Sequence, residues 1–128
     1  MKSLLAFVLA AVTVGSAALA DTATLDRLPG QSLTVTNWYK QSVYDPSNNK
    51  IGEVNDVLVT QDGKISALIV SVGGFLGMGE KDVAVPFASV NQTMKDGSVY
   101  LTLDTSKDAL KAAPGFKYDR SAMTWVPA

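Results

Sequence analysis

The chain has 128 residues, carries a formal net charge of −1, and contains neither cysteine nor histidine. This composition excludes disulfides, thiol catalysis, Cys/His zinc sites and histidine-based acid–base chemistry. The length predicts one small domain with one core, and the absence of a basic excess argues against a nucleic-acid partner.

Residues 1–20 have the pattern of a secretory signal peptide. Lys2 supplies a short basic start, residues 4–14 form an apolar run, and residues 18–20 read as an Ala-x-Ala cleavage site with the cut between Ala20 and Asp21. A membrane anchor is the alternative, but the run is shorter than the roughly 20 apolar residues of a spanning helix. We expect a periplasmic or secreted protein with no membrane span after cleavage.

Residues 21–31 are polar, contain Pro29-Gly30, and are expected to form a flexible lead-in. Leu33, Val35 and Trp38 then open a β-rich region. Two Asp-Gly pairs, at 62–63 and 96–97, predict tight hairpin turns because glycine accepts a positive φ. The expected strands are residues 42–44, 51–60, 65–72, 82–86 and 98–104.

The strand at 65–72 has apolar residues on both faces, so we expect it to be covered on both sides. The strand at 98–104 alternates, which places Val99, Leu101 and Leu103 inward. Five or six short strands with such turns favour a small barrel or sandwich of the all-β class.

One helix is expected after residue 104. Thr105 is its predicted N-cap, and Pro114-Gly115 ends it. Its predicted apolar side consists of Ala109, Leu110, Ala112 and Ala113. In the tail, residues 115–128, we expect the aromatic side chains of Phe116, Tyr118 and Trp125 to fold back onto the barrel or an edge strand.

Several motifs of this chain resemble those of the PRC-barrel family. They are Val43-Tyr44 before a turn, KIGEV at 50–54, Asp62-Gly63-Lys64, VGGFLGMGEK at 72–81 and VAVPF at 83–87. Such domains occur in the H subunit of photosynthetic reaction centres, in a ribosome maturation factor and in small stand-alone bacterial proteins. The resemblance implies a six-stranded β-barrel at residues 32–114 with one short C-terminal helix. It also implies an assembly or adaptor role, frequent dimers, and no shared catalytic residues or cofactor.

The glycine-rich segment at 73–80 carries the candidate protein contact. Phe75, Leu76 and Met78 stand among glycines, where apolar side chains are costly to leave in water. Either they pack over the mouth of their own barrel, or they contact a second copy or another protein.

Three other sites are weaker. Oxygen-bearing side chains occupy positions 1, 3, 5, 9 and 12 of a calcium-loop pattern, but lysine replaces the glycine at its turn; the residues are Asp45, Ser47, Asn49, Glu53 and Asp56. Glu53 and Asp56 are expected on opposite faces of a strand, which is poor geometry for an acid–base pair. An aromatic ligand platform would need Trp38, Tyr39 and Tyr44, but aromatic residues near the start of a small barrel more often pack in its core or at its rim.

The sequence therefore predicts an exported, non-enzymatic PRC-barrel protein that acts as a protein–protein interaction or assembly module in the cell envelope. Its expected partner is a second copy, forming a homodimer, or an envelope protein, and not a nucleic acid. The alternative is a periplasmic barrel that binds a small molecule or a cation.

Overall fold

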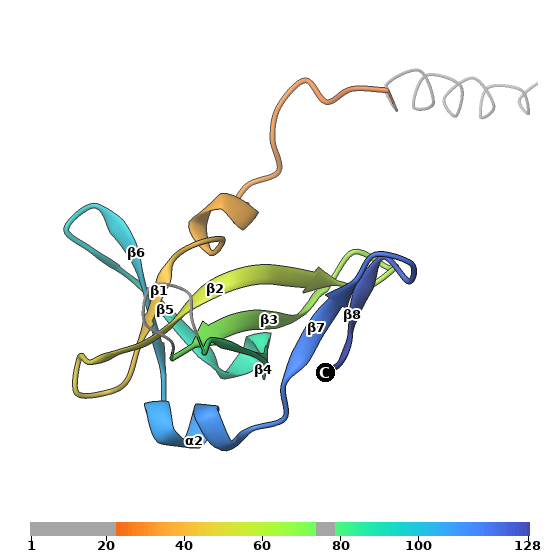
Figure 1. Cartoon of the computed structure of the whole chain (residues 1–128). Helices are drawn as coiled ribbons and strands as arrows, with labels where there is room; N and C mark the ends of the chain where they lie inside the picture. Colours follow the sequence, from red (N-terminus) through yellow and green to blue (C-terminus); the bar gives the residue numbers. More distant parts are fainter. Residues whose placement is uncertain (1–22, 74–78) are drawn as a thin grey trace, which may run out of the picture. The chain divides into compact units, whose positions relative to one another are not determined.

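A computed structural model describes residues 23–73 and 79–128 of the chain (Figure 1). Its contacts divide the chain into two units, Met1–Ser32 and Leu33–Ala128. In the described part of the first unit, the Ser32 hydroxyl donates a hydrogen bond to the Pro29 carbonyl oxygen at 2.6 Å. Within the described ranges, no helix is both long enough and apolar enough to cross a bilayer.

The second unit contains one sheet of eight strands in the order β5-β6-β1-β2-β3-β4-β7-β8 (Figure 1). Neighbouring strands are antiparallel except for β1 and β6, which are parallel. The strands are β1 (Ser42–Tyr44), β2 (Lys50–Val59), β3 (Ile65–Val72), β4 (Lys81–Pro86), β5 (Val90–Lys95), β6 (Ser98–Leu103), β7 (Phe116–Asp119) and β8 (Thr124–Pro127). There are also three short helical segments: η2 (Val35–Asn37) before β1, η3 (Phe87–Ser89) between β4 and β5, and α2 (Lys107–Ala112) between β6 and β7. The all-β class with one short helix is confirmed. Six strands, β1–β6, lie within residues 32–114, the number that the resemblance implied, and five of them match the ranges expected from the sequence.

The start of the β-rich region differs from the prediction. Val35–Asn37 forms a single 3₁₀ turn instead of extended chain, and the Trp38 N–H closes it on the Val35 carbonyl at 2.9 Å. The turn gives Trp38 a place in the core, where it is only 2% exposed.

The helix also differs in detail. Its N-cap is Ser106, not Thr105, and the Ser106 hydroxyl accepts a hydrogen bond from the Ala109 N–H at 3.1 Å. Leu110 is the one buried residue of α2, while Ala109 and Ala112 are exposed. A six-residue helix presents less than two turns, so a single large side chain anchors it.

The core is built from residues of five strands, together with Trp38 after η2 and Leu110 of α2. Its buried members are Trp38, Val43, Ile51, Val54, Leu68, Val70, Val72, Val83, Val85, Leu101, Leu103 and Leu110. The predicted alternation in β6 is confirmed, and β3 is covered on both faces as expected. Ile69 is fully buried outside this cluster, opposite Asp56 of β2 and Ala84 of β4.

Strands β2 and β3 approach each other unusually closely at Gly52. A Cβ atom at this position would stand 2.6 Å from Val70 Cγ1 and 2.8 Å from the Ser71 carbonyl oxygen. Both distances lie well inside van der Waals contact, so the packing of β2 on β3 requires glycine here.

The tail folds back onto edge strand β4, as the sequence predicted, and it forms a hairpin that was not predicted. Strands β7 and β8 pair with each other, and Phe116 pairs with Asp82 at the edge of β4. The Trp125 indole N–H donates to Asp56 Oδ2 at 2.7 Å, and the Trp125 ring meets Tyr118 edge-on at 5.9 Å. Since Asp56 shares the outer face with Ile69, this hairpin is placed to cover that buried side chain.

Candidate interaction surface

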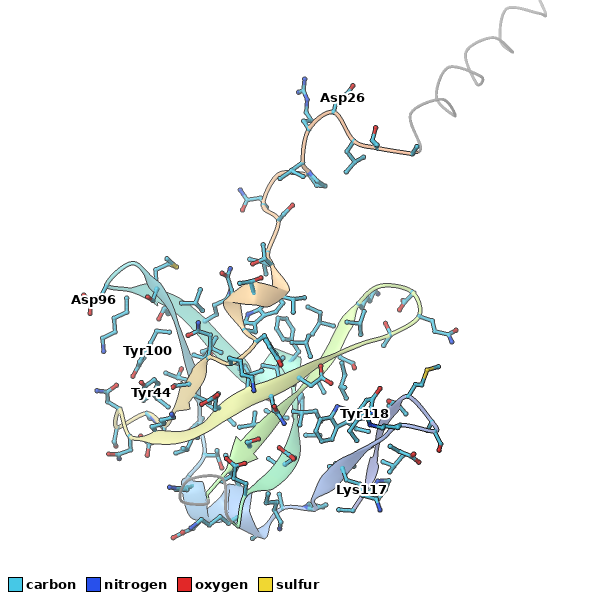
Figure 2. All side chains as sticks on the ribbon, turned by 45° about the horizontal axis from the view of Figure 1, so that its top comes forward. Asp26, Tyr44, Asp96, Tyr100, Lys117 and Tyr118 are labelled. Atoms are coloured by element: carbon cyan, nitrogen blue, oxygen red, sulfur yellow. The ribbon has the colours of Figure 1, made fainter. Side chains whose placement is uncertain are left out.

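The β5–β6 hairpin contains β5, the most exposed strand of the sheet among the described residues. Its two turn residues, Asp96 and Gly97, have φ values of +52° and +80°, the combination of a type I′ turn. This confirms the predicted Asp-Gly hairpin, and Figure 2 shows Asp96 at its tip. The preceding strand β5 was not predicted, because VNQTMK lacks an apolar alternation.

Strand β5 is an edge of the sheet. Within the part of the chain that the structure describes, its only strand partner is β6, and every residue from Asn91 to Lys95 is exposed. Natural edges are usually blocked by proline, by several charges or by a bulge. Here β5 has no proline, its register with β6 is unbroken, and its one charge is Lys95 at the end.

The turn type determines which backbone groups face outward. A two-residue turn makes its flanking residues, Lys95 and Ser98, a hydrogen-bonded pair, and such pairs then alternate along the ladder. The backbone N–H and C=O groups of Gln92 and Met94 therefore point to the free edge. At Val90 only the C=O does so, because the Val90 N–H donates to the Phe87 carbonyl oxygen at the end of η3. The side chains of these three residues lie on the core side of the hairpin, opposite Leu103, Leu101 and Val99.

Trp38 fixes the base of this hairpin. Its indole N–H donates to the Gln92 side-chain oxygen, and its ring packs edge-on against Phe87 with centroids 5.0 Å apart. Trp38 is thus a core anchor, while Tyr39 is 47% exposed and Tyr44 stacks elsewhere. The three residues do not form a common ligand platform.

A second set of contacts supports the other side of the hairpin (Figure 2). The rings of Tyr44 and Tyr100 stack with centroids 4.9 Å apart, and Lys95 Nζ lies 4.4 Å from the centre of the Tyr100 ring. The Tyr100 hydroxyl donates to Asn48 Oδ1 in the β1–β2 turn. These groups line a shallow groove of about 390 Å³ and hold β6 against β1.

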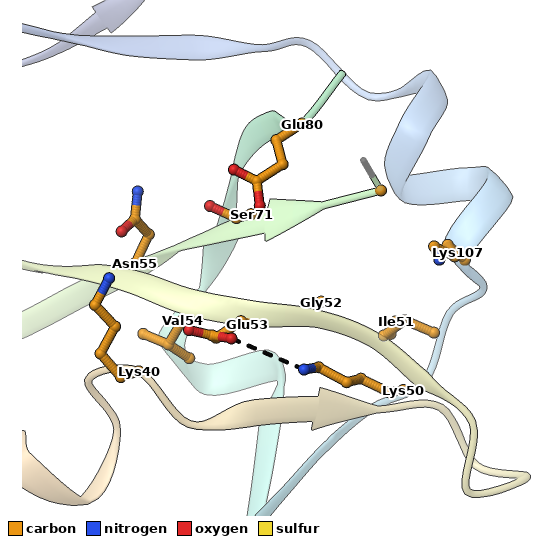
Figure 3. Close-up of a pocket in the computed structure, with 11 residues that line it drawn as sticks. Lys40, Lys50, Ile51, Gly52, Glu53, Val54, Asn55, Ser71, Glu80 and Lys107 are labelled. Carbon is orange, nitrogen blue, oxygen red and sulfur yellow. Dashed lines mark ion pairs between the residues drawn. The ribbon is translucent and has the colours of Figure 1, made fainter. Parts of the chain in front are cut away.

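A larger groove, of about 470 Å³, lies along the outer side of β2 near the start of α2 (Figure 3). Lys40, Lys50 and Lys107 line it together with Glu53 and Glu80, and Lys50 Nζ stands 3.8 Å from Glu53 Oε1. The two signs of charge are mixed, so this groove offers no single-sign surface to a phosphate or a cation.

The calcium-loop residues do not form a loop. Asp45, Ser47 and Asn49 lie in the β1–β2 turn, whereas Glu53 and Asp56 lie in strand β2. Asp45 Oδ1 accepts the backbone N–H groups of Ser47 at 2.9 Å and Asn49 at 2.8 Å. The Asn49 N–H is the main cause of a lowered pKa for the Asp45 carboxyl. The carboxylate closes a turn, and its oxygens are already engaged.

The predicted placement of Glu53 and Asp56 on opposite faces was wrong. The register of β2 against β3 shifts between Val54 and Asp56, so Asn55 is an extra residue in a β-bulge. The bulge brings Glu53 and Asp56 to the same outer face. Each has its own partner there, Lys50 for Glu53 and Trp125 for Asp56.

Lys81 has a structural role at the end of α2. Its ammonium group donates to the carbonyl oxygens of Lys111 and Ala113, both at 2.7 Å. These carbonyls end α2, where a cation satisfies acceptors that have no partner inside the helix.

The sequence-predicted contact residues Phe75, Leu76 and Met78 lie outside the described residues, as do Ala20 and Asp21 of the predicted cleavage site. Among the described residues, the exposed edge lies instead in β5, a strand that was not predicted from the sequence. One signal was available: an Asp-Gly turn at 96–97 before a clear strand requires a second strand on its other side.

Fold and surface together define a small all-β module with an open strand edge in its described part. The family model of the PRC-barrel domain matches residues 31–110. The chain belongs to the PRC-barrel family. Among curated proteins, no match to the chain is found.

Proposed function

We propose that this chain is an exported, non-enzymatic PRC-barrel protein that serves as a protein–protein interaction or assembly module in the cell envelope. The observation that carries the proposal is the edge strand β5, whose exposed residues lack the usual blocking features. Such an edge offers backbone donors and acceptors to a partner strand. Export is supported by the leader pattern of residues 1–20.

A non-enzymatic role is supported by how the described polar side chains are used. Asp56 accepts from Trp125, and Asp82 accepts from Ser71 at 2.5 Å. Lys81 caps α2. Groups with the chemistry for acid–base catalysis thus serve the packing of the hairpin, the sheet and the helix.

The proposed contact includes β5 and, from the sequence, the apolar residues Phe75, Leu76 and Met78. The two regions make separate predictions, because a substitution in one leaves the other unchanged. The partner is either a second copy or another envelope protein.

Site-specific photo-crosslinking in the envelope of an expressing bacterium tests this function. A photoreactive phenylalanine analogue replaces Met94 in β5 or Phe75, and the control position is Lys64, an exposed residue in the turn after β2. We expect discrete protein adducts from position 94 or 75 and none above background from position 64. Equal, background-level adducts from all three positions would overturn the interaction role.

A further inference from the structure

We infer that the partner of β5 is β5 of a second copy, paired antiparallel across a two-fold axis that passes between the two Gln92 residues. This inference rests on the proposed interaction role and specifies its partner. Three properties of the strand support it: its free backbone groups, its side-chain pattern and its charge.

The free backbone groups are self-complementary. The free groups are the N–H and C=O of Gln92 and Met94 and the C=O of Val90, and these three residues are spaced evenly about Gln92. A two-fold axis at Gln92 places Met94 opposite Val90 of the partner subunit and Gln92 opposite its own copy. Gln92 and its copy then exchange two hydrogen bonds, and each Met94 N–H donates to the Val90 carbonyl oxygen of the partner subunit, giving about four new backbone hydrogen bonds.

The side chains of the same residues fit this register. Met94 lies on the core side of the hairpin yet is 70% exposed, which leaves an apolar side chain beyond the end of the core. Val90 is half-buried and packs against the core. Pairing Met94 with Val90 of the partner subunit extends the core across the interface at both ends of the strand pair.

Charge decides between antiparallel and parallel pairing. Lys95 is the one charged residue of β5. Antiparallel pairing about Gln92 separates the two Lys95 residues by six positions, or roughly 20 Å, which exceeds the screening length of about 8 Å at physiological ionic strength. Parallel pairing in register would place these two cations side by side, which is destabilising.

The strand is also held in shape before it meets a partner. Trp38 binds the Gln92 side chain on the core side, and the Tyr44–Tyr100 stack supports β6 from the opposite side. An edge fixed in extended form loses less conformational entropy when it pairs.

Cysteine trapping tests the register directly, because the chain has no cysteine of its own. In the two-fold pair, the Cα atoms of Gln92 and its copy would lie about 5.5 Å apart, within the range for a disulfide. The Cα atoms of Asn91 and its copy would lie about 8 Å apart, outside that range. We expect mild oxidation of the exported, processed protein to give covalent dimers with Gln92→Cys and few with the matched control Asn91→Cys. Equal trapping of both variants, or none with Gln92→Cys, would overturn the proposed pairing.

Sedimentation equilibrium of the same processed protein tests the edge itself. Met94→Pro removes an outward N–H without removing a hydrogen bond to β6, since Met94 and Val99 are not a hydrogen-bonded pair. We expect Met94→Pro to weaken self-association roughly tenfold or more, and the control Met94→Leu to leave it within about twofold. Circular dichroism checks that both variants are folded.

The outcomes separate this inference from the proposed function. A wild-type chain that stays monomeric at high concentration, yet gives photo-adducts with other proteins from position 94, refutes self-pairing and leaves the interaction role intact. Unchanged self-association in Met94→Pro also refutes pairing through β5. Absence of both self-association and photo-adducts refutes the inference and the proposed function together.

Discussion

The close approach of β2 to β3 makes a quantitative prediction for Gly52→Ala. The added methyl group would meet Val70 Cγ1 at 2.6 Å and the Ser71 carbonyl oxygen at 2.8 Å. A side-chain methyl can rotate away, but the carbonyl belongs to the backbone of a strand that is buried on both faces. We therefore expect the substitution to lower the free energy of unfolding by about 2 kcal/mol, within the usual range for overpacking.

Urea unfolding followed by circular dichroism measures this effect. With a slope of about 1.5 kcal/mol per molar urea, the midpoint should fall by about 1.3 M. Gly30→Ala is the matched control, because a Cβ at Gly30 meets nothing within 4 Å; its midpoint should stay within about 0.3 M of the wild type.

A second substitution separates the two contacts. Val70→Ala removes Cγ1 but leaves the Ser71 carbonyl, so in that background Gly52→Ala should cost less and still remain destabilising. If Gly52→Ala unfolds at the same urea concentration as Gly30→Ala, the argument from close packing is refuted.

Three further predictions concern single contacts. Trp125→Phe removes the indole donor to Asp56 and should destabilise the β7–β8 hairpin by about 1–2 kcal/mol, seen as faster hydrogen exchange in residues 116–127 than in β3. Lys81→Met removes the cation from the end of α2 and should cost about 1 kcal/mol in urea unfolding. The Asp45 carboxyl has a lowered pKa, so its turn should be fully stabilised above pH 4, near the unfolded pKa, and lose that stabilisation as the pH falls through the folded pKa. The Asn49 amide shift should report the folded pKa in an NMR titration, and Asp45→Asn should abolish the transition.

Each of these has a result that contradicts it. Unchanged exchange in residues 116–127 of Trp125→Phe would mean that the indole hydrogen bond does not hold the hairpin. Equal stability of Lys81→Met and a control at exposed Lys64 would remove the capping role. An Asn49 amide that titrates at the ordinary aspartate pKa of about 3.9 would mean that the carboxylate does not close the turn.

The sequence predicted the elements whose signals are local. The Asp62-Gly63 turn formed between the expected strands, with Gly63 at a φ of +90°. The strand at 65–72 was predicted to be covered on both faces because it is apolar at successive positions, and Leu68 and Ile69 are both fully buried.

The features that were not predicted depend on how strands pair or on competition between neighbouring residues for one role. The bulge at Asn55 depends on the register of β2 against β3, so no pattern in β2 alone signals it. Thr105 and Ser106 are both good N-caps, but the Thr105 N–H bonds the Leu103 carbonyl at 2.8 Å, which holds Thr105 in the turn after β6 and leaves the cap to Ser106. The side chains of β5 are largely exposed, and its sequence therefore lacks the apolar alternation of a half-buried strand. For this reason the sequence pattern did not predict the edge strand on which the proposed function rests.

The parallel pairing of β1 with β6 has a consequence for how the domain folds. Val43 pairs with Leu101, and every other strand of the core lies between them in the chain. Hairpins such as β2–β3 close small loops and form early, but the β1–β6 ladder requires closure of a long loop, whose entropy cost must be met before its contacts contribute. We expect the transition state for folding to be limited by this closure. A growing chain therefore cannot complete its core until residues up to Leu110 have become available.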